Sequence, residues 1–291
     1  MKTLRGVVAP ILTPFNDDLS IATDLFVEKA NALLDEGAVG LAPFGTTGEA
    51  LSVSTPERLA ALKALINSGI DGDRIVPGTG LCNLADTVDL SKACLDMGCG
   101  GVMTLPPFYY KEATQEGLYE YFCQLAKEIA GSAIYLYHIP QVSGVPIWPE
   151  LARKLFEDVT EVVGIKDSSG VWENTEALLA IEGMIVYPAS EAALLKALPL
   201  GATGSITATA NVQAGAIAKL IEAWDRSPAE AEALFPPIEA VRKAVQSRSF
   251  ISPQKRALSL VGDKRWATVR PPLSPATVED GEALAREIGL M

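Results

Sequence analysis

The sequence predicts an α/β protein, a (β/α)8 TIM barrel with a small C-terminal helical extension. Short apolar runs rich in β-branched residues alternate with segments of helical periodicity, which is typical of βα units around a parallel sheet. About eight such units occupy roughly the first 225 of the 291 residues. A closed barrel fits this number better than an open doubly wound sheet, which usually has fewer strands.

The expected strands and helices follow one another in alternation. We expect strands at residues 6–13, 37–44, 74–78, 101–105, 133–137, 162–166, 184–187 and 201–207. We expect helices at residues 22–35, 56–66, 84–97, 116–129, 149–156, 174–181, 191–198 and 213–224. Pro56 and Pro149 support two of the helix starts, because the first residue of a helix needs no intrahelical N–H bond.

The strand pattern stops after Trp224. Apolar residues recur at helical spacing between Ala231 and Val245, and residues 278–288 form a last amphipathic segment behind several prolines. No low-complexity segment or flexible linker separates this part from the rest. We therefore expect a catalytic barrel over residues 1–225 and a helical extension over residues 226–291 that packs on it.

Composition excludes several classes of function. The 24 Lys and Arg residues against 36 Asp and Glu give a formal net charge of −12. Nucleic acids and anionic membranes require clustered basic residues, so neither is expected as a partner. The single histidine, His138, excludes a zinc site with two or three histidines. Motifs of phosphate loops, dinucleotide-binding folds, zinc proteases and serine hydrolases are absent from the sequence, and we expect no metal and no cofactor.

The cysteines and the first residues favour the cytoplasm. The four cysteines contain no CxxC pair and are expected to be reduced thiols. The first residues lack the pattern of a signal peptide, and no apolar run approaches the length needed to cross a membrane.

A lysine ends one of the expected strands. Reactive side chains of such a barrel come from the C-terminal ends of its strands and the loops that follow. Lys166 shares one face of its strand with Gly164, and we expect this face to be the barrel interior. Burial there disfavours the ammonium form and frees an amine that can form a Schiff base with a carbonyl. The alternative is a strand-end lysine whose ammonium reaches solvent.

The expected strand before it carries Tyr137 near its end. A phenol close to a Schiff-base lysine can relay protons, and a core tyrosine with a bonded hydroxyl is the alternative. His138 falls on the opposite face of the strand, which favours a structural role.

A short polar loop follows the expected strand at residues 37–44. Its residues 45–49 read Gly-Thr-Thr-Gly-Glu. Two hydroxyls and successive backbone N–H groups between glycines can form an anion-binding concavity that needs no positive side chain. Such a loop would let an acidic protein hold a substrate carboxylate. An ordinary turn is the alternative for this motif taken alone.

Five motifs together resemble, in order and spacing, the dihydrodipicolinate synthase and N-acetylneuraminate lyase family. They are Gly45-Thr46-Thr47-Gly48-Glu49, Tyr109-Tyr110 followed by Thr114-Gln115-Glu116-Gly117, Tyr137-His138-Ile139-Pro140, Gly164-Ile165-Lys166-Asp167 and Gly204-Ser205-Ile206. The resemblance covers essentially the whole chain and is specific for the superfamily rather than for one substrate.

The resemblance implies a class I aldolase that binds pyruvate through a Schiff base, without a cofactor. It implies that Lys166 attacks the keto carbon and that Tyr137 serves the proton transfers. It further implies that Thr46 connects Tyr137 with a Tyr110 contributed by a neighbouring subunit. The expected assembly is a homotetramer, built as a dimer of dimers.

The same resemblance suggests the substrate-binding residues. Thr47 and nearby amides, including that of Gly48, would hold the pyruvate carboxylate, and Ile206 would line the pocket. Val142 stands where dihydrodipicolinate synthases typically carry an arginine that contacts a substrate carboxylate. Glu191 remains as a polyol-binding candidate where sialic-acid lyases tend to have an Asp-Glu pair, and it could equally interact with the start of the following helix.

These departures favour an aldolase or lyase that forms or cleaves a 2-keto acid, such as a 2-keto-3-deoxy-sugar acid, with pyruvate and an aldehyde as its small-molecule partners. The alternatives in the same family are 4-hydroxy-tetrahydrodipicolinate synthase and a Schiff-base dehydratase. Cys82 stands where lysine-inhibited synthases usually have asparagine, which argues against feedback by lysine. Alternatives of other classes are a metal-dependent barrel aldolase or isomerase and a non-catalytic keto-acid-binding relative.

Overall fold

The structure is a computed structural model that describes residues 3–291. The chain divides into two compact units, each assembled from separate parts of the sequence. The first unit comprises Met1–Gly6 and Asp71–Ile206, and the second comprises Val7–Ile70 and Thr207–Met291.

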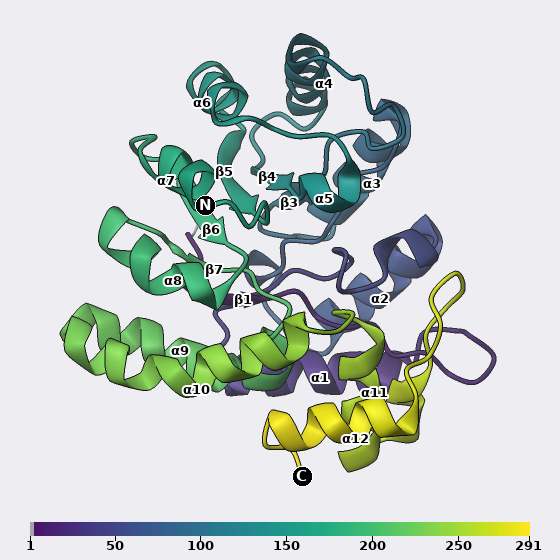
Figure 1. The fold of residues 1–291 in the computed structure, drawn as a ribbon. Helices are drawn as coiled ribbons and strands as arrows, with labels where there is room; N and C mark the ends of the chain where they lie inside the picture. Colours follow the sequence, from purple (N-terminus) through teal and green to yellow (C-terminus); the bar gives the residue numbers. More distant parts are fainter. Residues whose placement is uncertain (1–2) are drawn as a thin grey trace. The chain divides into compact units, whose positions relative to one another are not determined.

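A parallel sheet of four strands organises the first unit, in the order β3-β4-β5-β6 (Figure 1). The strands are β3 (Val102–Thr104), β4 (Ile134–His138), β5 (Val162–Asp167) and β6 (Ile185–Pro188). The spatial order equals the chain order, as expected for successive right-handed βα units. A short strand, β7 (Gly204–Ser205), follows beside β6, where the Thr203 N–H donates to the Val186 carbonyl at 3.1 Å.

Helices connect these strands. They are α3 (Leu84–Asp96), α4 (Gln115–Glu128), α5 (Pro140–Ser143), α6 (Pro149–Asp158), α7 (Trp172–Leu179) and α8 (Glu191–Ala197), with the short 3-10 turns η2 (Gly72–Arg74) and η3 (Leu198–Leu200). Trp148 occupies the N-cap position of α6, and Pro149 lies in the first turn, as the sequence predicts. Asn83 and Thr114 cap α3 and α4 by accepting backbone N–H bonds from their first turns.

The strand expected at residues 74–78 is reduced to isolated bridge residues, Ile75 and Gly78. Gly78 forms its bridge with Met103. The Met103 N–H donates to the Pro77 carbonyl at 2.9 Å, and the Thr79 N–H donates to the Met103 carbonyl at 3.1 Å. Pro77 has no N–H to donate, so pairing cannot extend through it as a regular ladder.

The second unit contains a parallel pair of strands and most of the C-terminal helices. The strands are β1 (Gly6–Ala9) and β2 (Gly40–Leu41), paired through Val8 with Gly40 and Ala9 with Leu41. The helices are α1 (Thr23–Asp35), α2 (Thr55–Asn67), α9 (Ala210–Arg226), α10 (Pro228–Gln246), α11 (Ser252–Val261) and α12 (Val278–Glu287), with the 3-10 turns η1 (Ala50–Ser52) and η4 (Lys264–Ala267).

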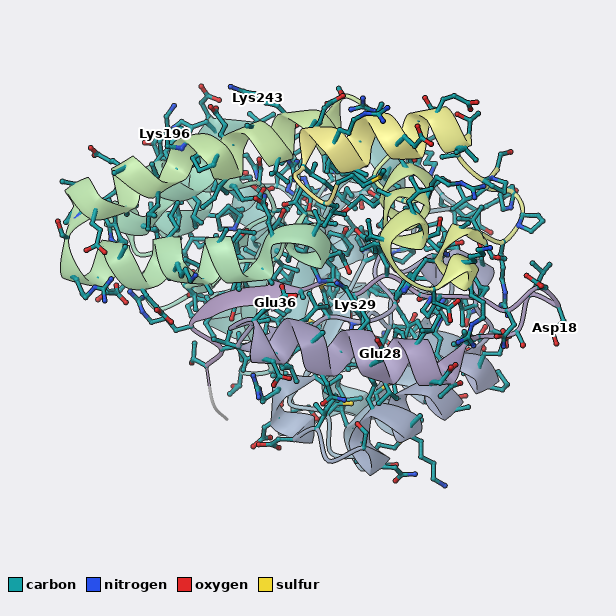
Figure 2. All side chains as sticks on the ribbon, turned by 90° about the horizontal axis from the view of Figure 1, so that it is seen from below. Asp18, Glu28, Lys29, Glu36, Lys196 and Lys243 are labelled. Atoms are coloured by element: carbon teal, nitrogen blue, oxygen red, sulfur yellow. The ribbon has the colours of Figure 1, made fainter. Side chains whose placement is uncertain are left out.

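Helix α1 shows why this unit holds together. Its residues Leu25, Phe26 and Leu33 are buried, whereas Glu28 and Asp24 are exposed, so one apolar stripe faces the core. Figure 2 shows α1 with Glu28, Lys29 and Glu36 beside the C-terminal helices. Burial lowers the pKa of Lys29, and Glu36 partly offsets this effect.

Two apolar clusters fix the C-terminal segment. One joins helices α10, α11 and α12 through Val245, Ala257 and Leu284. The other places Trp266 against Leu12 and the start of α1. The extension over residues 226–291 therefore packs on residues that precede position 70, and the boundary at residue 225 stays a prediction. No helix among the described residues is both long and apolar enough to cross a membrane.

Candidate functional site

Lys166 and Tyr137 lie side by side near the ends of strands β5 and β4. They are direct partners in the parallel register, so their side chains leave the same face of the sheet. Both residues are 3% exposed, and Lys166 Nζ lies 4.2 Å from the centroid of the Tyr137 ring. Burial of Lys166 contradicts the alternative in which its ammonium reaches solvent. Gly164, on the same face, is also buried.

The opposite face of the same two strands carries a buried polar cluster. His138 and Asp167 are the next register pair, and His138 Nδ1 lies 3.2 Å from Asp167 Oδ1 with both side chains 1% exposed. Asn174 Nδ2 lies 3.2 Å from the same His138 nitrogen. Thr175 Oγ1 donates to Asp167 Oδ2 at 2.5 Å, and the Ser169 N–H donates to Oδ1 at 3.0 Å.

These contacts set the charge of Asp167. Burial, the largest influence, raises its pKa, but hydrogen bonds from His138, Thr175 and the Ser169 N–H together hold the pKa below its usual value. The structural role of His138 stays a prediction, and these buried contacts support it. Its partnership with Asp167 was not foreseen, although the shared register of the two strands would have given the pairing.

The Gly-Thr-Thr-Gly-Glu loop lies in the second unit, between β2 and η1. Thr47 and Gly48 are buried, and Thr46 is half-buried. A Cβ on Gly48 would lie 2.9 Å from the Ile11 carbonyl oxygen, so a larger residue would displace backbone. Thr13 Oγ1 donates to the Gly48 carbonyl at 2.7 Å. The loop is thus a tightly packed turn rather than an open surface one.

Backbone strain marks both ends of this loop. Phe44 and Glu49 have positive φ angles of 57° and 54°, in the left-handed region that residues with a Cβ rarely adopt. Conformations of this kind persist only where surrounding contacts enforce them, and they concentrate at functional sites. Phe44 is held by stacking on Phe26, with ring centroids 5.7 Å apart.

The other candidate site residues differ in exposure: Tyr110 and Val142 are exposed, and Ile206 and Glu191 are buried. Tyr110 is 72% exposed, and its ring packs edge-on against Tyr109 with centroids 5.3 Å apart. Val142 is 59% exposed on helix α5. Ile206 is buried, and Glu191 is completely buried as the first residue of α8. The Glu191 position fits an interaction with the positive end of that helix.

Helix α5 is hydrogen-bonded to two segments that carry candidate residues. One is the end of strand β5, which carries Lys166, and the other follows Tyr110. Gln141 Nε2 donates to the carbonyl of Ser168, two residues after Lys166, at 2.6 Å. On the other side, Lys111 Nζ donates to the Ser143 carbonyl at 2.7 Å. Val142 therefore lies on a short helix that is tied both to the end of β5 and to the residue after Tyr110.

Comparisons with family models, curated proteins and solved structures all match the same protein family. A model of the dihydrodipicolinate synthetase family matches residues 3–289. An uncharacterised DapA-like lyase of Chloroflexus aurantiacus is 32% identical over 98% of this chain and 96% of its own. The crystal structure of dihydrodipicolinate synthase from Agrobacterium tumefaciens is 29% identical, with a TM-score of 0.87 over 98% of this chain and 99% of the other.

A further solved structure supports the fold. YagE, a prophage protein of the dihydrodipicolinic acid synthase family from E. coli K12 solved in complex with pyruvate, is 24% identical. Its TM-score is 0.91 over 99% of each chain. These similarities confirm the predicted (β/α)8 barrel with its helical C-terminal region.

Proposed function

Because the chain belongs to the dihydrodipicolinate synthetase family, we propose that it is a pyruvate-dependent class I aldolase that forms or cleaves a 2-keto acid through an imine on Lys166. The observation that carries this proposal is the buried amine of Lys166 beside the Tyr137 ring, at 4.2 Å. The amine lies where bulk water is largely excluded, next to a phenol that can move protons.

In this scheme the neutral Lys166 amine attacks the keto carbon of the substrate, and the resulting carbinolamine loses water to give a protonated imine. In the cleavage direction, the imine accepts the electron pair of the breaking carbon–carbon bond, and an aldehyde leaves. The enamine that remains takes up a proton, and hydrolysis releases pyruvate and the free amine. Tyr137 carries protons to and from the carbinolamine oxygen and the aldehyde oxygen.

The substrate carboxylate binds, in this proposal, to the backbone amides and hydroxyls around Thr47 and Gly48. An anion held by backbone dipoles needs no arginine, which suits a chain with a net charge of −12. Thr46 passes protons between Tyr137 and Tyr110 of a neighbouring subunit. The exposure of Tyr110 on a single chain supports this arrangement, because an aromatic side chain 72% exposed is a good interface residue.

The proposed assembly is a homotetramer, built as a dimer of dimers, in which the tyrosine is shared between two subunits. Light scattering of the purified protein should give the mass of four chains, and Tyr110→Ala should lower the turnover rate while Tyr137 and Lys166 remain in place. A monomer with full activity would contradict both the assembly and the role of Tyr110. We place the enzyme in the cytoplasm, and the four thiols in the described chain, all free of disulfides, support this compartment.

The substrate is proposed to be a 2-keto-3-deoxy-sugar acid or a related 2-keto acid. Val142 presents a methyl-bearing side chain where a synthase would present a guanidinium, so the second substrate needs no carboxylate at this place. Ile206 lines the pyruvate pocket, and Glu191 is the candidate for a substrate hydroxyl. The second candidate function is 4-hydroxy-tetrahydrodipicolinate synthase, favoured by the names of several full-length relatives.

The experiment that tests the mechanism is reduction of the protein with borohydride in the presence of pyruvate. Mass spectrometry should find one reduced pyruvate adduct, on Lys166, and Lys166→Ala should abolish both adduct and turnover. No adduct, or an adduct on another lysine, would refute the imine mechanism. Loss of activity with EDTA alone would favour a metal-dependent aldolase, and pyruvate binding without an imine would favour a non-catalytic relative.

The substrate is best identified by a retro-aldol screen that reports pyruvate release from 2-keto acids. Val142→Arg is its companion, because the new guanidinium supplies the carboxylate contact that the wild-type helix lacks. A gain of activity with aspartate semialdehyde in this variant would indicate that the chain descends from a synthase. Activity of the wild type with the same aldehyde would instead favour the synthase as its present function.

A further inference from the structure

Glu49 and Lys255 form a completely buried ion pair in the second unit. Lys255 Nζ lies 2.5 Å from Glu49 Oε1, with both side chains 0% exposed. The ammonium also donates to the Thr13 carbonyl at 2.8 Å and lies 4.5 Å from the centroid of the Phe15 ring. The other carboxylate oxygen, Oε2, accepts the backbone N–H of Arg270 at 3.1 Å. Each oxygen of Glu49 is thus bound by a residue from the C-terminal segment, more than 200 positions away.

This pair acts on the strained end of the Gly-Thr-Thr-Gly-Glu loop. Glu49 adopts φ 54° and ψ 37°, a conformation disfavoured for any residue with a Cβ. The Glu49 N–H donates to the Thr46 carbonyl at 3.1 Å, so rotation of Glu49 into an ordinary conformation would break the turn that presents Thr46, Thr47 and Gly48. The ion pair supplies contacts that enforce the unfavourable angle.

Lys255 also holds the loop from a second direction. The Thr13 carbonyl accepts from its ammonium, and the Thr13 hydroxyl donates to the Gly48 carbonyl at 2.7 Å. One ammonium therefore fixes the residue after Gly48 directly and Gly48 itself through Thr13. A buried ammonium with two such acceptors is suited to defining a geometry, since a buried ion pair adds little to stability over an apolar pair of the same volume.

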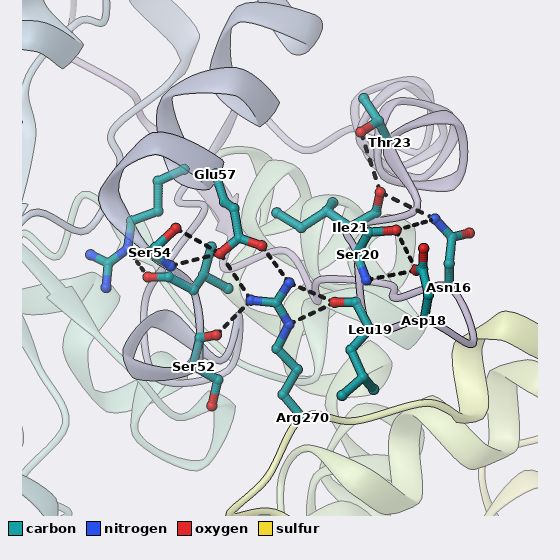
Figure 3. A network of polar contacts seen from close by, with 12 residues as sticks. Asn16, Asp18, Leu19, Ser20, Ile21, Thr23, Ser52, Ser54, Glu57 and Arg270 are labelled. Atoms are coloured by element: carbon teal, nitrogen blue, oxygen red, sulfur yellow. Dashed lines mark hydrogen bonds and ion pairs between the residues drawn. The ribbon is translucent and has the colours of Figure 1, made fainter.

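Arg270 extends the same anchor beyond Glu49. Its guanidinium donates to the Ser52 carbonyl at 2.7 Å, to the Leu19 carbonyl at 2.6 Å and to both oxygens of Glu57 (Figure 3). The chain that leaves the loop, from Glu49 to the start of α2, is thus bound along its length by the C-terminal segment.

We propose that Lys255 is a positioning residue: its buried pair with Glu49 holds residues 46–48 in the conformation that receives the substrate carboxylate. This proposal rests on the proposed function of the loop. It gives the C-terminal helical segment a part in substrate binding as well as in folding.

The test compares wild type with Lys255→Met, which keeps the length and apolar stem of the side chain and removes the charge. Hydrogen exchange of the amides of residues 45–52 should become about tenfold faster, because the turn opens more often. The pyruvate concentration that half-saturates borohydride trapping should rise about tenfold, whereas the trapping rate at saturating pyruvate should change by no more than about threefold. If this variant does not fold, Glu49→Gln preserves the shape of the pair and should shift both readouts in the same direction.

The matched control is Arg248→Met. Arg248 forms an ion pair of 2.6 Å with Glu287 of α12, in the same C-terminal segment but partly exposed. This variant should leave loop exchange and pyruvate half-saturation within about twofold of wild type, even where thermal stability falls. Unchanged loop exchange in Lys255→Met, or equal changes in control and test variants, would overturn the proposal. Absence of any pyruvate adduct in wild type would refute the proposed function, and the exchange measurement would still decide whether the pair holds the loop.

Discussion

Replacement of Gly164 by alanine is the sharpest structural perturbation available beside Lys166. Gly164 pairs with Ile185 across β5 and β6, two residues before the lysine. A Cβ on Gly164 would lie 2.3 Å from the Ile185 carbonyl oxygen and 2.7 Å from its Cβ. Real Cβ contacts essentially never fall below 3.0 Å, so the two strands must separate locally by about 0.7 Å. The opposing atom is main-chain oxygen, which cannot rotate away.

The expected cost has two components. Overpacking of this kind destabilises a protein by about 1–3 kcal/mol. Movement of β5 also displaces Lys166, and a misplacement on the order of 1 Å at a reacting group slows the reaction by about 100-fold. We therefore expect Gly164→Ala to lower the free energy of unfolding by about 2 kcal/mol and to slow pyruvate trapping by roughly 10- to 100-fold.

Urea unfolding and the rate of borohydride trapping measure these two effects separately. The control is Gly117→Ala in helix α4, where the nearest atom to the new Cβ is Thr114 Oγ1 at an ordinary 3.5 Å. Alanine is a better helix former than glycine, so this variant should be equally or slightly more stable and should react at the wild-type rate. A Gly164→Ala protein with wild-type stability and trapping rate would refute the reasoning, because it would show that β5 and β6 already have the missing space.

Three further predictions concern stability. The ion pair with Arg270, the largest influence, lowers the pKa of Glu57 from 4.5 to about 2. The contribution of this ion pair to the free energy of unfolding is fully present above pH 4.5 and is lost as the pH falls towards 2. Since the Glu57 side chain is 35% exposed, we expect only about 1 kcal/mol, measured as a wild-type advantage over Glu57→Gln in urea unfolding at pH 7 that vanishes near pH 2. Asp167→Asn removes the carboxylate that binds Thr175, the Ser169 N–H and His138 and should cost about 2 kcal/mol, seen as a lower melting temperature at pH 7; an unchanged melting temperature would contradict a structural role for the cluster. Thr277→Ala removes the N-cap of α12 and should cost about 1 kcal/mol in the same unfolding assay, with no change in pyruvate trapping.

The sequence predicted the features that depend on local pattern. Strands β3 to β6 and most helices lie where periodicity placed them, because alternation and helical spacing are properties of a few consecutive residues. The burial of Lys166 next to Tyr137 followed from the same alternation, applied to two neighbouring strands. Proline at residues 56 and 149 correctly indicated the first turns of α2 and α6.

Features that depend on distant pairing were missed. Nothing in the residues around Lys255 distinguishes it from a surface lysine, since its partner Glu49 lies 206 positions away. The strand predicted at residues 74–78 is too long for a related reason: its pattern is apolar, but its pairing depends on the backbone of Met103 and on the missing donor of Pro77. The periodicity of side chains along the sequence does not indicate which buried charged residues pair with each other.

Each of the two units contains a buried polar pair next to candidate site residues. In the first unit, Lys166 and Tyr137 occupy one face of adjacent strands, and the next residues, Asp167 and His138, pair on the other face. In the second unit, the Gly-Thr-Thr-Gly-Glu loop, which is proposed to hold the substrate carboxylate, ends in Glu49, whose buried partner Lys255 lies in helix α11. The buried Glu49–Lys255 ion pair adds little net stability over an apolar pair but defines a single geometry, because either charge left alone would be strongly destabilising. Within each unit such a pair fixes the backbone next to it, and the proposed imine chemistry depends on reacting groups that are held in one orientation.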